Sequence, residues 1–255
     1  MRSRLLPLVL VLLAACGGGG NGGAVEPLAQ PATTDSTVGA ITLPQPTTTT
    51  TAYPVFETAT AQGPRVPVYD SPDAPEPSRT FASPNPIYGG GTIRVFLVKE
   101  NRGDWLNVYL PARPNGSTGW IRSSEVTIDS HTFRMVVELG ARRLTAYDKT
   151  DVIFDEPIAV GNSATPSSIG LFYTTELIIP VGQPQYGPYA WGLSAYSEVL
   201  YDFGGGDGQM GIHGTNDPSS IGRAASSGCI RLSNDSITRL VEMLPVAGVP
   251  VEIRA

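Results

Sequence analysis

The sequence predicts a mainly β protein in which a small β-barrel precedes a larger β domain with one main helix. Short β-rich runs separated by turn-forming residues recur between residues 61 and 128, at the spacing typical of a small barrel. Alternating apolar and polar residues return from residue 133 onward, as in half-buried strands. One stretch, residues 233–244, repeats its apolar side chains at helical spacing.

The chain begins with the pattern of an export signal. Residues 1–4 carry two arginines, and residues 5–15 form an apolar run that is too short to span a bilayer stably. Small residues directly before Cys16 resemble the lipobox of bacterial lipoproteins. That resemblance implies that residues 1–16 are a lipoprotein signal, that Cys16 is acylated, and that the exported protein is anchored to the outer face of the cell membrane. The alternative is an ordinary secretory signal with an incidental cysteine.

Residues 17–60 are predicted to form a disordered tether. They are rich in Gly, Thr, Pro and Ala and nearly free of charge. Such a segment cannot bury enough apolar surface to offset the entropy of the chain. A flexible tether of about 45 residues has a mean reach of roughly 35–40 Å, enough for an anchored domain to sample the layer outside the membrane.

The first predicted domain spans residues 61–128. The segments Gly103–Val108 and Gly119–Ile121 resemble the paired strands of a bacterial SH3-like domain, which implies a small β-barrel. Trp105 and Trp120 allow two interpretations, binding of the cell wall or filling of the barrel core. The core is favoured because large aromatic side chains usually fill a small barrel's interior. The β-rich runs are residues 66–69, 93–98, 105–110, 119–122 and 126–128.

The second predicted domain spans residues 129–255. Its helix is expected from Ser233 to Leu244, with Ser233 or Asn234 as the cap and Pro245 as the stop. A strand at residues 249–253 is expected to close the sheet. The other expected strands are residues 133–139, 144–147, 152–154, 158–160, 171–175 and 209–212.

Cys229 is the residue that points most directly to chemistry. The chain has two cysteines, and the export signal accounts for Cys16, so Cys229 is an unpaired thiol in an exported domain. Such a thiol is an intermolecular bridge, a buried structural residue or a reactive group. Gly228 before it and polar residues after it argue against the core. His213 lies sixteen positions earlier, and a thiol with a histidine that can take its proton is the minimum equipment for nucleophilic acyl transfer.

Several landmarks then fall together. The segments Ile212–Thr215 and Ser226–Asn234, with Gly161 and Thr165-Pro166 upstream, resemble the YkuD-type L,D-transpeptidase catalytic domain over nearly all of residues 131–254. The resemblance implies a β-sandwich fold and an acyl-enzyme between Cys229 and peptidoglycan tetrapeptide stems, which is transferred to an amine. It also implies covalent inhibition by carbapenem β-lactams.

One position departs from the family signature. The chain has Ser227 where the family has a histidine, although the histidine normally assigned as the base maps to His213. A serine supplies the same backbone groups, so we expect activity to be retained. The alternatives are an L,D-carboxypeptidase that uses water as the acceptor, and a catalytically weakened wall-binding lipoprotein. A third alternative is a sortase-like or general thiol protease, but this chain lacks the cysteine–arginine arrangement that is expected of a sortase.

The residues around Cys229 can be given roles. His213 is the expected base, oriented by a backbone carbonyl or hydroxyl near Gly214, Ser226 or Ser227. The N–H groups of Gly228 and Cys229 are expected to hold the tetrahedral oxyanion.

Four further residues are candidates for binding substrate. Arg231 steers a stem-peptide carboxylate or locks the site through hydrogen bonds, or else it forms a structural ion pair. Asn234 caps the helix or fixes the nucleophile loop. Tyr189 and Trp191 occupy the region of the family's flap, where they line the donor pocket or pack in the core.

Composition argues against some partners. The formal net charge is −6 and the basic residues are not clustered, so no nucleic-acid partner is expected. The acidic and glycine residues of 202–207 match no EF-hand spacing, so neither a metal nor a cofactor is expected.

Overall fold

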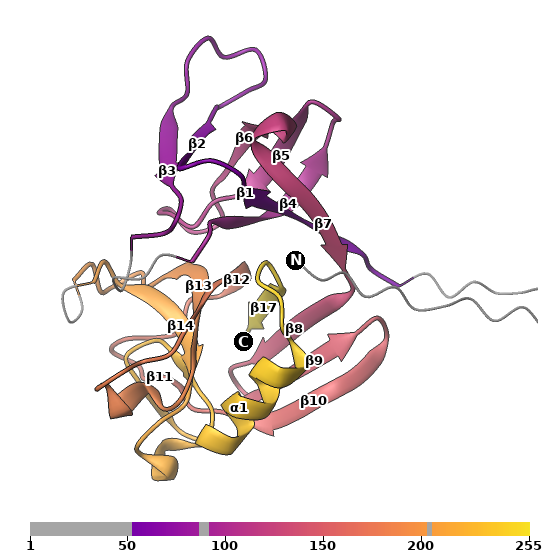
Figure 1. Ribbon diagram of the computed structural model, residues 1–255. Helices are drawn as coiled ribbons and strands as arrows, with labels where there is room; N and C mark the ends of the chain where they lie inside the picture. The colour runs from indigo at the N-terminus through magenta and orange to yellow at the C-terminus, as the bar shows by residue number, and fades with distance from the viewer. Residues whose placement is uncertain (1–52, 87–91, 203–205) are drawn as a thin grey trace, which may run out of the picture. The chain divides into compact units, whose positions relative to one another are not determined.

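The computed structural model describes residues 53–86, 92–202 and 206–255 (Figure 1). The export signal, Cys16 and most of the predicted tether lie outside the described residues. Within the described part of the chain, no helix is long and apolar enough to cross a membrane.

The first part of the described chain is an antiparallel five-stranded sheet in the order β6-β5-β4-β1-β7. A hairpin of two further strands, β2 and β3, accompanies it. Side chains that alternate along these strands fill one core, which includes Val66, Phe96, Leu106, Val108 and Ile121. The strands are β1 (Phe56–Ala61), β2 (Arg65–Val68), β3 (Arg79–Ala82), β4 (Val95–Asn101), β5 (Trp105–Tyr109), β6 (Thr118–Arg122) and β7 (Val126–His131).

Strand β1 lies inside the segment that was expected to be tether. It starts at Phe56 and pairs with both β4 and β7, so it is a central strand of the sheet. Ala59 and Ala61 are buried in the core. The expected end of the tether at residue 60 is therefore wrong by several residues. The small and polar side chains of β1 give no clear strand pattern in the sequence. The strand forms through pairing with β4 and β7, which lie far away in the sequence.

Trp105 and Trp120 are half-buried and do not belong to the core of the first sheet. Successive side chains of a strand point to opposite faces, and on β5 the fully buried residues are Leu106 and Val108, which leaves Trp105 on the other face. The guanidinium of Arg122 lies 4.4 Å from the ring centroid of Trp105, and that of Arg102 lies 4.5 Å from the ring of Trp120. The favoured placement of both tryptophans in the core was wrong.

The second part is built on an eight-stranded sheet in the order β10-β9-β8-β17-β12-β13-β14-β16. Its core includes Met135, Phe172, Leu193, Ile212 and Val251. A separate parallel pair joins β11 to β15. The strands are β8 (Phe133–Glu138), β9 (Arg143–Asp148), β10 (Asp151–Pro157), β11 (Val160–Gly161), β12 (Gly170–Ile178), β13 (Ala190–Tyr196), β14 (Gln209–His213), β15 (Ala224–Ser226), β16 (Ile230–Arg231) and β17 (Pro250–Arg254).

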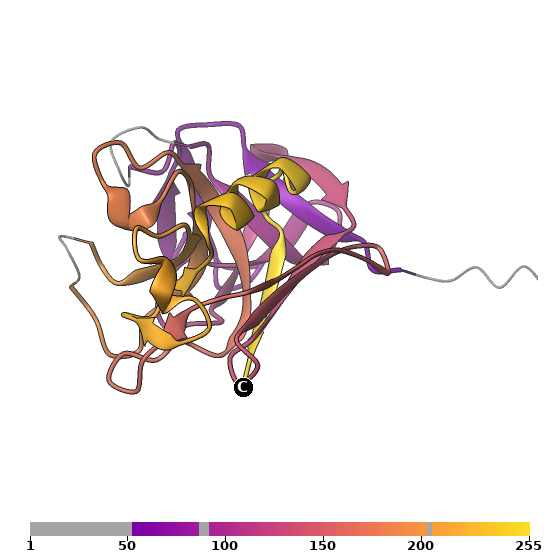
Figure 2. The ribbon, with the colours of Figure 1, turned by 90° about the horizontal axis from the view of Figure 1, so that it is seen from below.

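The described residues contain one α-helix, α1 (Asn234–Met243), which packs against this sheet (Figures 1 and 2). The Ser233 hydroxyl caps it by accepting a hydrogen bond from the Ser236 N–H at 3.1 Å. Ile237 and Leu240 enter the core of the sheet, and Arg239 forms an ion pair with Glu156 of β10. The prediction of a mainly β protein with one main helix is confirmed. Short 3₁₀ turns are η2 (Ser123–Glu125), η3 (Pro184–Tyr186) and η4 (Pro218–Ser220).

Both sheets belong to one compact unit of the described residues. A buried polar chain joins them. The Arg94 guanidinium donates to Asn85 Oδ1 at 3.0 Å, and the Asn85 amide donates to Glu176 Oε2 at 3.0 Å. Gln209 Nε2 then donates to Glu176 Oε1 at 3.2 Å. Two charged side chains are thus buried at the junction with polar partners, as buried charges require.

Candidate active site

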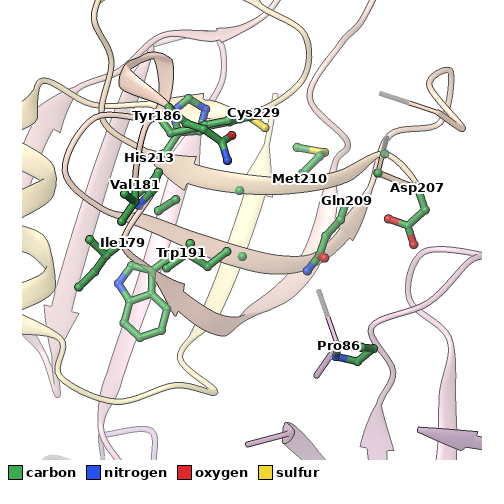
Figure 3. Close-up of a pocket in the computed structure, with 18 residues that line it drawn as sticks. Pro86, Ile179, Val181, Tyr186, Trp191, Asp207, Gln209, Met210, His213 and Cys229 are labelled. Atoms are coloured by element: carbon green, nitrogen blue, oxygen red, sulfur yellow. The ribbon is translucent and has the colours of Figure 1, made fainter. Parts of the chain in front are cut away.

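Parallel pairing of β14 and β16 brings His213 and Cys229 together. Ile212 is opposite Ile230 and His213 is opposite Arg231. Continuing this register by one residue places Cys229 beside Gly211. Gly211 and His213 lie on the same face of β14, since they are two residues apart on a strand. Cys229 and His213 therefore meet at one end of a cleft (Figure 3).

His213 is held as a neutral imidazole. Its Nδ1 atom lies 2.5 Å from the carbonyl oxygen of Gly214, and the residue is 4 % exposed. The pKa of His213 is lowered to about 4, mainly by burial. The hydrogen bond to Gly214 raises this pKa, and the charge of Arg231 lowers it. Gly214 is one of the three orienting partners that the sequence left open.

The thiol of Cys229 is protonated at rest. Burial raises its pKa, while a backbone hydrogen bond from Gly211 and the charge of Arg231 act in the opposite direction. A neutral thiol beside a neutral imidazole is an uncharged pair, so the thiolate would form only as the proton passes to His213 during attack.

Two serines fix the backbone of the nucleophile loop. The Ser226 hydroxyl donates to the Cys229 carbonyl at 2.6 Å and accepts from the Gly228 N–H at 3.2 Å. The Ser167 hydroxyl donates to the Gly228 carbonyl at 2.7 Å. Gly228 has φ +115°, a region that favours glycine. The structure thus engages the Gly228 N–H with Ser226, which differs from its expected role as an oxyanion donor.

A second loop holds the backbone of the nucleophile loop by hydrogen bonds. The Ser226 carbonyl accepts hydrogen bonds from the Asn162 side chain at 3.0 Å and from the Asn162 N–H at 3.1 Å. Thr165 Oγ1 donates to the same oxygen at 3.3 Å. A side chain on Gly161 would collide with the backbone of Thr165 and Ser167, so this turn requires glycine. The sequence marked Gly161 and Thr165 only as landmarks, without these contacts.

The cleft that holds Cys229 has a volume of about 810 Å³. Tyr186, which the sequence did not single out, packs its ring edge-on against His213 with centroids 4.9 Å apart. Ile179, Val181, Trp191 and Met210 give the cleft apolar walls (Figure 3). Among the lining residues that the structure describes, Asp207 is the one with a charged side chain.

Comparison with known proteins gives this geometry a family. The model of the YkuD family, described as an L,D-transpeptidase catalytic domain, matches residues 132–253. The YkuD protein of Bacillus licheniformis is 33% identical over 144 residues, which cover 53% of this chain and 79% of the relative. The YkuD protein of Bacillus subtilis (strain 168) is 33% identical over 142 residues, with the same coverage.

The chain belongs to the YkuD family of L,D-transpeptidases.

A solved structure of an L,D-transpeptidase from Mycobacterium smegmatis is also similar to this chain. It has 15% sequence identity and a TM-score of 0.39, and the match covers 64% of this chain and 91% of that one.

The other predicted site residues of this YkuD-family chain have mixed placements. Ser227 is half-buried beside Gly228. Arg231 does not line the cleft, and within the described residues it has no ion pair and its buried Nε has no hydrogen-bond partner. The predicted structural ion pair of Arg231 is thus not formed there, while its charge acts on both Cys229 and His213.

Asn234 holds the loop that follows His213. Its Oδ1 atom accepts a hydrogen bond from the Thr215 N–H at 2.9 Å. The same oxygen packs so closely on Gly187 and Gly214 that a side chain at either glycine would collide with it. Asn234 does not line the cleft, so this geometry supports the fixing of a loop rather than the binding of substrate.

Trp191 and Tyr189 are anchored to the core rather than to a flap. Trp191 belongs to strand β13, is 3 % exposed and is part of the core, with its cleft-facing side exposed to the cavity. Tyr189 packs against the same core and does not line the cleft. In the segment just before β13, Tyr186 is the residue whose ring contacts His213. Among the described residues, no cluster of three metal-ligating side chains occurs.

Proposed function

We propose that the chain is a cysteine-dependent L,D-transpeptidase that transfers peptidoglycan tetrapeptide stems to an amine acceptor. The observation that carries the proposal is the position of Cys229 beside a buried, neutral His213 whose Nδ1 is occupied by the Gly214 carbonyl. This leaves Nε2 as the proton acceptor. Membership of the YkuD family supports the substrate class.

The reaction follows from these two groups. Cys229 Sγ attacks the carbonyl carbon before the terminal D-alanine, and its proton passes to His213 Nε2. Collapse of the tetrahedral intermediate breaks the C–N bond, and the imidazolium returns the proton to the departing amine. The acceptor amine then attacks the thioester and gives a proton to His213. The thiolate leaves and recovers that proton, which restores the resting pair.

The surroundings of the protein are part of the proposal. Acylation of Cys16 would anchor the chain to the outer face of the membrane, with the residues that precede β1 as a tether to the wall. Several acyl chains hold a protein firmly on a membrane, whereas one holds it only marginally. The first sheet, whose segments resemble an SH3-like domain, would accompany the catalytic domain there.

Product analysis tests the proposal. Purified protein incubated with disaccharide-tetrapeptide should give cross-linked dimers, detected by mass spectrometry, and Cys229→Ala should give none. Trimmed tripeptide without dimers would instead establish an L,D-carboxypeptidase that uses water as the acceptor. Binding to sacculi without any turnover would support the weakened, wall-binding alternative. A carbapenem should add covalently to Cys229, which an intact-mass shift would report.

A further inference from the structure

One loop of the first sheet is hydrogen-bonded to a segment that lines the cleft of Cys229. Arg113, in the β5–β6 loop, donates from Nη2 to the carbonyl oxygens of Ser197 and Leu200, each at 2.9 Å. From Nη1 it donates to the carbonyl oxygen of Asp207 at 2.7 Å. One guanidinium therefore binds the residues that follow β13 and a residue that precedes β14.

Two aromatic rings hold the guanidinium of Arg113 in place. It lies 4.8 Å from the ring centroid of Tyr196 and 4.6 Å from that of Tyr201. A planar guanidinium can stack on rings while its fixed fork of donors reaches several acceptors, which a lysine ammonium cannot reproduce. The Arg113 contacts thus depend on the shape of arginine and not only on its charge.

Asn115 adds a second attachment from the same loop. Its side-chain amide donates to the Tyr196 carbonyl at 2.7 Å, and its Oδ1 accepts from the Tyr196 N–H at 2.8 Å. The Tyr196 hydroxyl donates to the carbonyl oxygen of Pro111 at 3.1 Å. Both backbone polar groups of Tyr196, at the end of β13, are therefore hydrogen-bonded to the β5–β6 loop.

The segment that precedes β14, where Arg113 binds Asp207, lines the cleft. Gly206, Asp207 and Gly208 all belong to the cleft lining, as does Gln209. Gly208 has φ +80°, and a side chain there would collide with the Leu200 carbonyl oxygen. The Ser197 N–H donates to the Gly208 carbonyl at 2.9 Å. Arg113 and these close contacts together fix one conformation of the wall.

We propose that Arg113 is a positioning residue for substrate binding, which acts from the first sheet through the wall formed by Gly206–Gln209. This inference rests on the proposed function for the nature of the substrate, a peptidoglycan stem peptide. The hydrogen bonds to Cys229 and His213 come from Ser226, Gly211 and Gly214, none of which belongs to the wall. Loss of the Arg113 hydrogen bonds should therefore weaken binding of the long substrate and leave the reactivity of the Cys229 thiol unchanged.

The test compares Arg113→Ala and Arg113→Lys with Arg102→Ala. Arg102 is a matched control, since it also stacks on an aromatic ring of the first sheet but pairs with the exposed Glu100. In both Arg113 variants we expect the KM for disaccharide-tetrapeptide to rise about tenfold, with kcat within about threefold of wild type. The rate of alkylation of Cys229 by iodoacetamide should stay within about twofold.

Hydrogen exchange provides a readout that needs no substrate. The Ser197 and Leu200 amides, which are bonded within the segment, should exchange about tenfold faster in Arg113→Ala than in Arg102→Ala. Unchanged exchange would contradict the claim that Arg113 holds the wall. Faster exchange with an unchanged KM would contradict a role of Arg113 in substrate binding. If Arg113→Ala does not fold, Arg113→Lys carries the same measurements. A wild-type chain inactive on tetrapeptide would contradict the proposed function, while exchange would still decide whether Arg113 holds the wall.

Discussion

The Nδ1 atom of His213 lies 2.5 Å from the carbonyl oxygen of Gly214, its neighbour in the chain. A carbonyl oxygen only accepts hydrogen bonds, so Nδ1 carries the ring proton and Nε2 keeps its lone pair. Burial keeps the ring neutral by lowering its pKa to about 4. The resting site thus holds a base that is ready at neutral pH.

The pH dependence of catalysis should reflect this base. Because the pKa of His213 is lowered to about 4, the acid limb of kcat/KM should have its midpoint near that value rather than near the ordinary histidine value of about 6.5. A pH–rate profile of tetrapeptide turnover measures the midpoint. An acid limb centred at about 6.5 or higher would show that His213 is not the neutral base described.

Folding stability should also depend on His213. Between about pH 4, where the folded group titrates, and about 6.5, the unfolded value, the unfolded chain binds more protons. The free energy of unfolding should therefore rise with pH across this window, by up to about 3 kcal/mol, and be lost as pH falls through it. His213→Gln should flatten the wild-type slope in denaturant titrations. Since His131 is present in both proteins, the difference between them isolates His213.

Gly228→Ala should impair both folding and catalysis. The φ of +115° makes a side chain strained, at a cost on the order of 1–3 kcal/mol, and relaxation of the backbone would displace Cys229. The control is Gly103→Ala, where φ is +76° and nothing lies within 4 Å of an added Cβ. Both variants should lower the melting temperature, but only Gly228→Ala should slow acylation by a carbapenem. Equal acylation rates in the two would refute a positioning role for Gly228.

Ser227→His should change acylation by less than about tenfold. The contacts that orient His213 come from Gly214 and Tyr186. The carbonyl of Ser226 is held by the loop of Asn162 and Thr165. None of these contacts needs a side chain at residue 227. The rate of carbapenem adduct formation in the two proteins decides this point, and a gain far above tenfold would show that the family histidine has a direct catalytic role.

Asn234→Ala should destabilise the fold and slow acylation. It would leave the N–H of Thr215, a residue 3 % exposed, without its acceptor, at a cost of about 1–3 kcal/mol. Asn234→Asp keeps the acceptor oxygen and should restore most of both losses. Thermal melts and carbapenem acylation rates measure the two effects. Failure of the aspartate to rescue would mean that the Thr215 contact is not the one that matters.

Local patterns explain which parts of the fold were predictable. The helix could be bounded from sequence because Ser233 caps it and Leu244 and Pro245 follow its last turn. The strand from Phe133 shows its alternation directly in the sequence, although three successive residues of it, Met135, Val136 and Val137, are buried. Strand β1 escaped prediction because its order comes from β4 and β7, which lie far along the chain.

The site divides in the same way. Cys229 and His213 were identified from residue chemistry and a family signature, and pairing of β14 with β16 brings them together. The engagement of the Gly228 N–H by Ser226 was not predictable, since it depends on the backbone conformation at a single glycine. The Arg113 contacts span more than eighty residues, which no local pattern records.

The most direct measurement is the mass of the intact protein during turnover of disaccharide-tetrapeptide. The wild type should carry a covalent adduct equal to the donor less its terminal D-alanine, mapped by peptide fragmentation to Cys229. The adduct should disappear on addition of hydroxylamine, as a thioester does, and His213→Gln should form it far more slowly. Products formed by Cys229→Ala, or turnover by wild type through an adduct on another residue, would contradict the assignment of Cys229 as the nucleophile.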